Sequence, residues 1–453
     1  MHHLLLAIAT LAPPAQPTEE VRGHIEHAGE ARIVHVYGTP AEMGYAHGWL
    51  VGADFVRGIQ QLFEILPPST HGMVEVMRGW TPLISLSPAH REELSAMYRG
   101  LRDRVGEDGL ILPGVERPLD ETDLLLWNGY DMFRVVGCSG FTVWGAQTSD
   151  GAALTGRTLD LAVFSPHWVD TQILLVRHPT TGYATASLTP VCLLGAMTGI
   201  NEHGVCAFLH DGDGPQMDAV LEPERPVMLA MLDILQQATP ETAQEVARRE
   251  LSSQGPFPFS YMVRVIDGNV SKDAPARTWH LGPDGTRPAK PGRSLTITTN
   301  HTTASGDEPP RLRVGDSYAR YAMLHEACRP EQGLMDFDAA WKALALVEQD
   351  HRSFMTLHAI VVQPGSGAVQ LCFAGTNERG QLRPAMNRPV TTLQLRDLFA
   401  TKPPEATPTE ATPPEATAPE ATPTEAKPRE EAGTEAKSHA SFTPLPVAAR
   451  ENG

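Results

Sequence analysis

The sequence predicts an α+β fold built on antiparallel sheets. Two observations lead to this prediction: runs of alternating apolar residues come in pairs joined by tight turns, and runs with helical periodicity are grouped between those pairs. A doubly wound parallel sheet would instead alternate one strand with one helix along the chain.

The part of the chain before the first predicted hairpin is mostly helical in pattern. In the segment GTPAEMGYAHGWLVGADFVRGIQQLFEIL, Thr39 is placed to cap a helix, Pro40 to occupy its first position and Glu42 its third. A second helix is predicted from Ser87 onward, and the segment DETDLLLWNGYDMF predicts a third.

Three hairpins follow. The first joins CSGFTVWGAQ to AALTGRTLDL through residues 148–151, because Asp-Gly between alternating apolar runs is a strong hairpin signal. The second turns at residues 181–182 and the third at residues 201–204. Beyond them the sequence predicts helices in RPVMLAMLDILQQ and from Thr239, strands in YMVRVIDG and LTITTN, helices in DSYARYAMLHEA and FDAAWKALALVEQ, and a closing hairpin, TLHAIVVQPGSGAVQLCFAG.

Both ends of the chain predict segments outside the folded domain. Residues 4–12 are apolar but too few to span a bilayer, and small residues and prolines follow, so residues 1–17 are predicted to be a signal peptide. Export to the periplasm or the medium is therefore expected; a cytoplasmic protein with a frayed apolar N-terminus is the alternative. Residues 398–453 repeat glutamate and proline at short intervals, which predicts a disordered spacer.

The composition excludes some classes of function. The 453 residues include 54 acids against 36 lysines and arginines, a formal net charge of −18. Affinity for nucleic acid comes largely from basic residues on phosphates, so a nucleic-acid partner is not expected. The cysteines include no CxxC pair, so structural zinc and thioredoxin chemistry are not expected, and no cofactor or metal is predicted. Whether Cys192 and Cys206 pair stays open.

One cysteine has an unusual setting, because Cys138 follows Gly137 at the start of a predicted strand. If the peptide bond between them is cut, Cys138 becomes N-terminal, and its α-amine, with a pKa of about 7.7–8.0, is partly a free base beside its own thiol. Amine and nucleophile then share one residue. The thiol can make this cut itself by attacking the preceding carbonyl to give a thioester, which water releases. Glycine at position 137 removes a Cβ that would crowd the attack.

Six segments of the chain resemble a known family. They are GTPAEMGYAHG at 38–48, GCSGFTVWG around the cysteine, GRTLDL at 156–161, TGINEHGV at 198–205, TTNH at 298–301 and DSYARYAML at 316–324. Together and in this order they resemble the cysteine N-terminal-nucleophile (Ntn) hydrolases, and among these the autoproteolytic acyltransferases typified by isopenicillin-N acyltransferase. Choloylglycine hydrolases and acid ceramidases are more distant relatives.

The resemblance implies a four-layer αββα sandwich of the Ntn-hydrolase type. It also implies a precursor that is cut into an α chain of residues 18–137 and a catalytic β chain of residues 138–397, which stay docked. The implied reaction is hydrolysis or acyl transfer at a linear amide C–N bond through a thioester on Cys138. The expected partners are a small-molecule acyl amide and an acyl-accepting amine.

The resemblance assigns catalytic roles to six residues, which are Cys138, Arg157, Asp160, Asn201, Asn300 and Arg320. The cysteine would be the nucleophile, the aspartate would hold its terminal amine, and the first arginine would lower the thiol pKa. The two asparagines would polarise the tetrahedral oxyanion, and the second arginine would complete the ring of charge around the thiolate. Because Arg157 and Asp160 are three residues apart on one strand, they are expected on opposite faces unless a bulge intervenes.

Each of these residues also has a simpler interpretation when it is taken alone. Arg157 with Asp160 would be a surface ion pair. Asn201 would be a turn former and Asn300 a loop residue. Arg320 would be a solvated helix charge, and the cysteine would be buried core.

Other motifs support other functions less well. A cysteine–histidine protease pair lacks any local protease signature, although four histidines are candidates for it: His47, His203, His210 and His301. The run from Asp211 to Asp213 resembles the start of a calcium loop whose remaining ligands are missing, so a turn is favoured. Two alternative functions stay open, a fatty-acyl amidase of the acid ceramidase or N-acylethanolamine type and a non-catalytic relative that binds a ligand.

Overall fold

The computed structural model describes most of the chain between its two ends. The described residues are 16–129, 136–163, 166–214, 216, 222–253, 257–268, 274–311, 315–329, 334–351 and 354–402. Residues 1–15 of the predicted signal peptide and 403–453 of the predicted tail lie outside the described residues. Within the described part, no helix combines the length and the apolar character that a membrane crossing needs.

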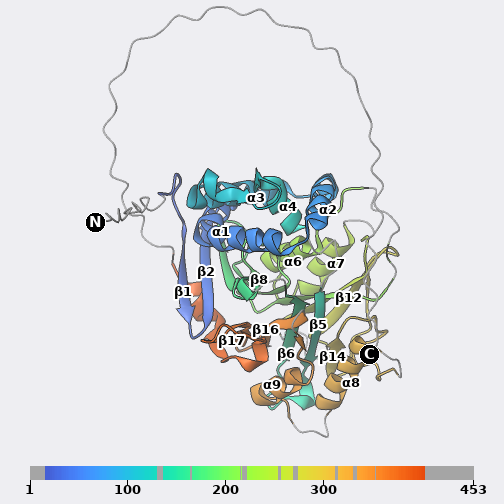
Figure 1. The fold of residues 1–453 in the computed structure, drawn as a ribbon. Helices are drawn as coiled ribbons and strands as arrows, with labels where there is room; N and C mark the ends of the chain where they lie inside the picture. The colour runs from blue at the N-terminus through green and yellow to red at the C-terminus, as the bar shows by residue number, and fades with distance from the viewer. Residues whose placement is uncertain are drawn as a thin grey trace, which may run out of the picture.

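Two β-sheets packed face to face form the middle of the molecule, and helices cover the outer face of each (Figure 1). The nine-stranded sheet has the order β1-β2-β7-β8-β9-β10-β11-β12-β13, and the seven-stranded sheet has the order β14-β5-β6-β16-β17-β20, with β15 beside β16. Strands β2 and β7 pair in parallel, whereas the other described pairs are antiparallel. The predicted α+β class and its αββα layering are therefore confirmed.

The strand bounds confirm the hairpins that the sequence predicts after residue 138, since β5–β6, β7–β8, β9–β10 and β16–β17 are antiparallel neighbours. The nine-stranded sheet consists of β1 Gly23–Ala28, β2 Ala31–Gly38, β7 Gln172–Pro179, β8 Thr185–Pro190, β9 Thr198–Asn201, β10 Cys206–Asp211, β11 Tyr261–Ile266, β12 Ala276–Leu281 and β13 Arg287–Pro288. The seven-stranded sheet consists of β14 Leu295–Thr298, β5 Val136–Val143, β6 Leu154–Ala162, β15 Asp350–His351, β16 Phe354–Gln363, β17 Ala368–Phe373 and β20 Thr391–Gln394. Two short pairs stand apart, β3 Ile111–Leu112 with β4 Arg117–Pro118, and β18 Gly375–Thr376 with β19 Leu382–Arg383.

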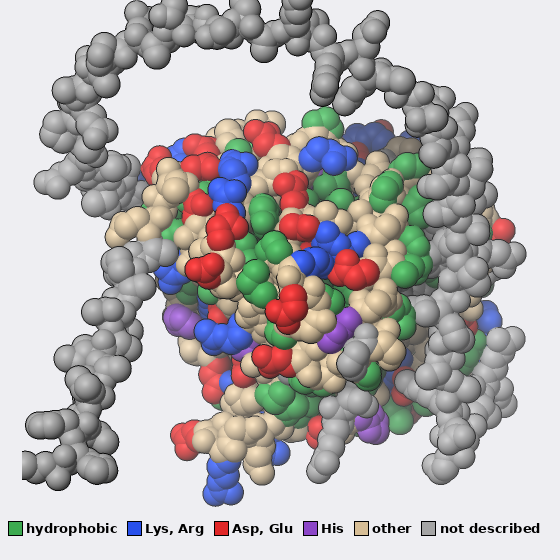
Figure 2. Space-filling view, turned by 45° about the horizontal axis from the view of Figure 1, so that its top comes forward, with side chains coloured by type: hydrophobic (Ala, Val, Ile, Leu, Met, Phe, Trp, Pro, Cys, Tyr) green, Lys and Arg blue, Asp and Glu red, His purple; other side chains and the backbone are tan. Residues whose placement is uncertain are grey.

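One half of the nine-stranded sheet is covered by helices from the first part of the chain, as predicted. Their bounds are α1 Pro40–Ile65, α2 Pro68–Arg78, α3 Pro88–Val105 and α4 Glu121–Asn128. Thr39 and Glu42 close a complete capping box on α1, and the side chain of Ser87 caps α3. Apolar residues of α1 and α3 share one buried cluster with β2 and β7. On the face that Figure 2 turns toward the viewer, acidic and basic side chains are interspersed.

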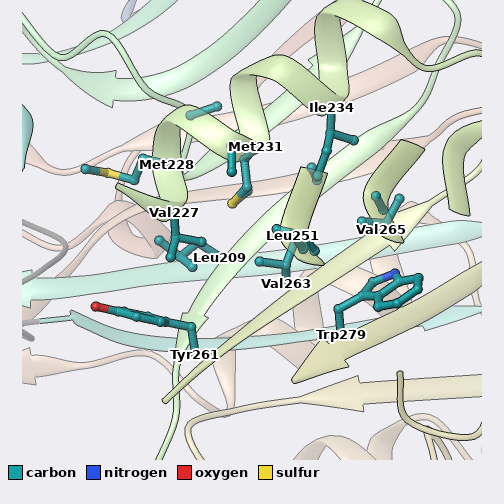
Figure 3. Close-up of a cluster of buried hydrophobic side chains, with 14 of the residues drawn as sticks. Leu209, Val227, Met228, Met231, Ile234, Leu251, Tyr261, Val263, Val265 and Trp279 are labelled. Atoms are coloured by element: carbon teal, nitrogen blue, oxygen red, sulfur yellow. The ribbon is translucent and has the colours of Figure 1, made fainter. Parts of the chain in front are cut away.

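The other half of this sheet is covered by α6 Val227–Gln237 and α7 Ala243–Ser252. Figure 3 shows Met231 and Ile234 of α6 above Val263 and Trp279 of the sheet. Helix α7 begins after the position expected, because residues 239–242 form a hydrogen-bonded turn before it. The seven-stranded sheet is covered by α8 Asp316–Ala327 and α9 Phe337–Ala345. A short helix, α5 Pro166–Val169, lies between β6 and β7 in sequence.

The hairpin β1–β2 differs from the sequence prediction, which expected the first part of the chain to be mostly helical. The two strands form one end of the nine-stranded sheet. One face of this hairpin carries His24, Glu26, His35 and Tyr37 together with the apolar Ile33, so polar and apolar residues are mixed on it. The usual alternation of apolar with polar residues is weakened in such a segment, and the periodicity signal fails with it.

The C-terminal boundary of the folded part also differs slightly from the expectation. Helix α10 spans Leu395–Ala400, so it continues past residue 397, where the folded part was expected to end. Two of its leucines, Leu395 and Leu398, join the cluster between the two sheets. All five cysteines are described, and each is buried and free, so Cys192 and Cys206 do not pair.

Helices α1 and α3 approach each other closely through glycines spaced one turn apart. A Cβ at Gly44 would collide with the carbonyl oxygen of Glu93, and a Cβ at Gly48 would collide with the carbonyl oxygen of Met97. The close approach of the two backbones therefore requires glycine at these positions.

Replacing Gly48 by alanine is expected to destabilise the protein. Gly48→Ala adds a methyl group where backbone leaves no room, and such overpacking costs about 1–3 kcal/mol. Gly72, within α2, is the matched control, since a Cβ there has nothing within 4 Å. Gly72→Ala is expected to stabilise by about 0.4–1 kcal/mol, because alanine restricts the unfolded chain. Urea denaturation followed by circular dichroism measures both changes, and equal effects would contradict the close packing of α1 on α3.

Candidate active site

The first hairpin after the helical segment fixes which side chains share a face. In the β5–β6 register Cys138 lies opposite Leu159, Gly140 opposite Arg157, and Gly137 opposite Asp160. Residues opposite each other in an antiparallel pair point to the same side of the sheet, and the side alternates along each strand. The thiol and the guanidinium of Arg157 therefore share one face, whereas Asp160 lies on the other face with Gly137. This confirms that the two charged residues point to opposite sides.

The thiol of Cys138 lies between the two sheets. Its Sγ donates to the carbonyl oxygen of Leu209 in β10, 3.3 Å away. Nη2 of Arg157 donates both to Sγ at 3.3 Å and to the same Leu209 oxygen at 2.6 Å. The sulfur and the guanidinium are therefore held together by one backbone carbonyl of the facing sheet.

Two residues that the sequence did not single out hold the rest of the Arg157 guanidinium. Its Nη1 donates to the hydroxyl of Thr198 and to Nε2 of His358, the latter at 3.2 Å. Burial, and then the charge of Arg157, keep the pKa of His358 well below its ordinary value. The ring is therefore neutral and accepts at Nε2. His358 stands out in the sequence only as a polar residue within the apolar run TLHAIVV.

The backbone of Cys138 is held by one residue next to the neighbouring strand and by one residue from the helical layer. Strand β14 pairs with β5, and Asn300, just beyond the end of β14, accepts the N–H of Cys138 with its Oδ1 at 2.9 Å. Arg320 of α8 donates from Nη1 to the carbonyl oxygen of Cys138 at 2.6 Å and from Nη2 to Oδ1 of Asn300 at 2.8 Å. Asp316, one turn earlier on α8, accepts from Nε of Arg320 at 2.8 Å.

Asp160 lies against the residue that precedes the cysteine. A Cβ on Gly137 would be 3.2 Å from the Cβ of Asp160. One carboxylate oxygen of Asp160 accepts from the hydroxyl of Thr356 at 2.6 Å, and the other is buried with no hydrogen-bond partner among the described residues. Burial raises the pKa of Asp160, while Arg320 and the Thr356 hydroxyl oppose that rise. This side therefore offers one unused buried acceptor next to the bond between Gly137 and Cys138.

The structure corrects the role expected for Asn201. Its Nδ2 donates to the carbonyl oxygens of Leu235 and Ala238, both at 2.8 Å, at the end of α6. Its Oδ1 accepts from the backbone N–H groups of His203 and Val205. Both amide hydrogens are used, so Asn201 ties the β9–β10 turn to α6 and is not arranged as an oxyanion donor here. The turn former, which was the simpler interpretation, is what the geometry supports.

Asn300 also contacts the cysteine differently from the expectation. It meets the Cys138 backbone through its oxygen, while its Nδ2 donates to the backbone carbonyl of Asp211 at 3.0 Å. Asp211 ends β10, and its charge is one of the influences that raise the pKa of Cys138. For the run from Asp211 to Asp213 the sequence predicts only a turn, and this influence of Asp211 on the thiol was not expected.

Burial controls the ionisation of the thiol in the full-length chain. The Cys138 side chain is 0% exposed, and burial raises its pKa to about 12. Arg157 opposes this rise but is outweighed, because desolvation penalises the thiolate more than one guanidinium stabilises it. Arg157 therefore acts to lower the thiol pKa, as expected, but the net effect is a raised pKa. The thiol is protonated at neutral pH.

The remaining candidates of the sequence analysis make other contacts. Nε2 of His47 accepts from the backbone N–H of Cys192 at 3.1 Å, and the rings of His203 and His301 pack on Tyr183 and Tyr318. In the described part of the chain, the hydrogen bonds of the Cys138 thiol go to Leu209 and Arg157 and not to these histidines or His210. A cysteine–histidine pair is therefore not supported.

Asp213, in the run that resembles the start of a calcium loop, has hydrogen-bond partners within the protein. Asp213 accepts from the Thr302 backbone and from the Tyr318 hydroxyl, both at 3.1 Å. A small pocket near these residues is lined by Gly214, Ser260, His280, Gly282, Arg287 and Thr302, among others, and does not include Cys138. The Cys138 thiol is therefore not part of this pocket.

Comparisons with known proteins give distant likenesses. No family model matches the sequence. An uncharacterized protein of Archaeoglobus fulgidus is 26% identical over 218 residues, which cover 41% of this chain and 34% of that protein. The chain thus spans about a third of the length of this curated relative.

Two solved structures are similar to the chain at low TM-scores. An ortholog of N-acylethanolamine-hydrolyzing acid amidase from Caenorhabditis elegans is 18% identical with a TM-score of 0.38, over 50% of this chain and 93% of that one. A mutant conjugated bile acid hydrolase from Clostridium perfringens is 12% identical with a TM-score of 0.40, over 58% of this chain and 95% of that one. We infer neither fold nor activity from likenesses at these TM-scores.

Replacing Arg320 by lysine is expected to loosen the support of the Cys138 backbone. Lysine keeps a charge but lacks the planar fork that reaches Cys138, Asn300 and Asp316 together. Because hydrogen bonds to charged groups contribute about 1.5–3 kcal/mol, Arg320→Lys is expected to lower the free energy of unfolding by that amount. Arg329, which pairs with Glu326 at the surface, is the control. Arg329→Lys should stay within about 0.5 kcal/mol of wild type in urea denaturation. Indistinguishable variants would show that the Arg320 fork contributes nothing.

Proposed function

We propose that this chain is the uncut precursor of an amide hydrolase or acyltransferase of the cysteine N-terminal-nucleophile class. The observation that supports the proposal most is the convergence of three side chains on one dipeptide: Arg157 donates to Sγ of Cys138, Asn300 accepts its N–H, and Asp160 lies against Gly137 with an unused buried oxygen. A cysteine of the core would need none of these contacts.

The first step of the proposal is cleavage of the bond between Gly137 and Cys138. The sulfur of Cys138 attacks the carbonyl carbon of Gly137, a C–S bond forms, and the C–N bond breaks. The proton of the thiol ends on the departing nitrogen, so the cysteine acquires an α-amine. Water then hydrolyses the thioester, which frees the thiol and leaves a carboxylate on Gly137. Asp160 suits proton transfer at this bond, because its pKa is raised by burial and it lies beside Gly137.

The second step is the activation of the thiol by this cut. The new α-amine has an ordinary pKa of about 7.7–8.0, so part of it is a free base at neutral pH. In the uncut chain, Oδ1 of Asn300 accepts a hydrogen bond from the backbone N–H of Cys138, and it would continue to orient the amine after the cut. Once water reaches the sulfur, the desolvation that raises its pKa is relieved, and the attraction of Arg157 then favours the thiolate.

The third step is turnover on an acyl amide. The α-amine of Cys138 takes the thiol proton, the thiolate attacks the amide carbonyl, and the C–N bond breaks as the departing amine takes that proton from the α-ammonium group. Water or a second amine then attacks the thioester and takes the acyl group, the C–S bond breaks, and a proton of the attacking group returns to the sulfur. The segment of residues 18–137 would remain docked after the cut, because β2 pairs with β7 and because Glu93 of α3 forms a buried ion pair with Arg177 of β7.

Intact mass of the full chain tests the self-cleavage. Wild type is expected to give two fragments that separate between Gly137 and Cys138, whereas Cys138→Ala is expected to give one. Cys372→Ala is the control, since Cys372 is also buried in the seven-stranded sheet but lies outside the site. The two wild-type fragments should co-elute in gel filtration and separate only in denaturant. If wild type and Cys138→Ala are cut to the same extent, a foreign protease makes the cut and the self-cleavage step is wrong.

Hydrolysis assays on the processed protein separate the remaining functions. Short acyl amides and fatty acyl amides are offered to wild type and to Cys138→Ala, with release of the amine as the readout. A preference for fatty acyl amides would favour the amidase alternative. Processing without turnover of any amide, together with retained ligand binding, would favour the non-catalytic relative and overturn the enzyme proposal.

A further inference from the structure

We propose that the edge hairpin β1–β2 carries a binding site for a divalent transition-metal ion, with Zn²⁺ as the ion that fits best. The ligands are His24, Glu26 and His35, and His178 is the residue that positions His35. The site is independent of the proposed function, because none of these residues is among the hydrogen-bond partners described for Cys138. No metal was expected from the sequence, because its cysteines include no CxxC pair.

The register of the hairpin brings the three ligands together. His24 of β1 lies directly opposite His35 of β2, and Glu26 lies two residues further along β1 on the same face. The candidate ligand atoms of these three side chains all lie within 4.8 Å of one another. In a tetrahedral zinc site with bonds of about 2.1 Å, ligand atoms are about 3.4 Å apart. Small side-chain rotations are therefore enough to close the cluster around an ion.

His35 is held so that one ring nitrogen faces the cluster. Its Nδ1 is 3.1 Å from Nε2 of His178 in β7, and its Nε2 is 3.3 Å from a carboxylate oxygen of Glu26. A metal-binding histidine usually has its other nitrogen hydrogen-bonded, which fixes the ring and its tautomer. His178 supplies this partner, and the parallel pairing of β2 with β7 positions it.

In the described part of the chain, the cluster has one ligand atom without a hydrogen-bond partner and one side open to solvent. Nδ1 of His24 is buried without a hydrogen-bond partner among the described residues. Glu26 is 46% exposed at its side chain, so the cluster opens to solvent on that side. An ion can enter from there and keep water as its fourth ligand.

The ligand chemistry selects the ion. Two imidazole nitrogens with one carboxylate suit Zn²⁺ and its first-row neighbours, whereas Mg²⁺ and Ca²⁺ prefer oxygen ligands throughout. The single negative charge of Glu26 leaves the bound site with one net positive charge, which the exposed side can solvate. The stacking of the His24 and His35 rings, with centroids 4.8 Å apart, is the competing explanation, in which the histidines are only packing.

The test uses the full chain, free of affinity tag and metal, titrated with Zn²⁺ against a coloured chelator and with Co²⁺ by visible absorption. Wild type is expected to bind one ion at this site, and its thermal midpoint is expected to rise with Zn²⁺. Glu26→Gln removes a ligand at an exposed position without disturbing the core. His178→Ala removes the positioning contact but none of the three ligands, and such a loss costs about 10–100-fold in metal affinity.

The matched control is His27, which follows Glu26 on β1 but points to the other face and is exposed. His27→Ala should bind Zn²⁺ as wild type does, and Cys138→Ala should as well, which separates this site from the thiol. His35→Ala should lose the site altogether. If Glu26→Gln and His35→Ala bind Zn²⁺ with wild-type stoichiometry and affinity, or if wild type binds neither ion, the histidines are packing residues and the proposal is wrong.

Discussion

The candidate active site depends on one buried guanidinium. Arg157 reaches from β6 into the space between the sheets, where a charge is costly unless its hydrogen-bond donors are satisfied. Its named partners are the Leu209 carbonyl from the facing sheet, the hydroxyl of Thr198, the ring of His358 and the sulfur of Cys138. The first three of these groups are neutral and cannot cancel the charge. The sulfur can become an anion, so this arrangement favours a thiolate as soon as the penalty of burial falls.

A second guanidinium controls the same residue from the opposite layer. Arg320 comes from α8, and it fixes the carbonyl of Cys138 and the Asn300 oxygen that holds the Cys138 nitrogen. The side chain and the backbone of the cysteine are thus positioned by separate elements on the two faces of one sheet. The uncut chain nevertheless has a protonated thiol, because burial outweighs Arg157. Geometry and ionisation are therefore separable here: the groups are in position before the nucleophile is activated.

The sequence predicted the parts of this arrangement that depend on local chemistry. The turn at residues 148–151 set the β5–β6 hairpin, and the spacing of Arg157 and Asp160 placed them on opposite faces of β6. What could not be predicted depends on packing between layers. Asn201 gives up both amide hydrogens to the end of α6, which is a tertiary contact that no turn motif reports. The role of Thr198 likewise exists only because β9 of the nine-stranded sheet packs on β6, and that of His358 depends on the pairing of β16 with β6.

The hairpin β1–β2 is a second feature that the sequence pattern did not predict. Polar and apolar residues are mixed on one of its faces, which hides the strand periodicity, so neither the hairpin nor the cluster of His24, Glu26 and His35 could be predicted. The parallel pairing of β2 with β7 then joins residues that a cut at Cys138 would assign to different chains, since His35 precedes the cut and His178 follows it. An ion bound at His35 would be held in place by a contact across that division. Its affinity would therefore report whether the two pieces remain paired after the cut, because a separated first piece keeps all three ligands but loses the ring that orients one of them.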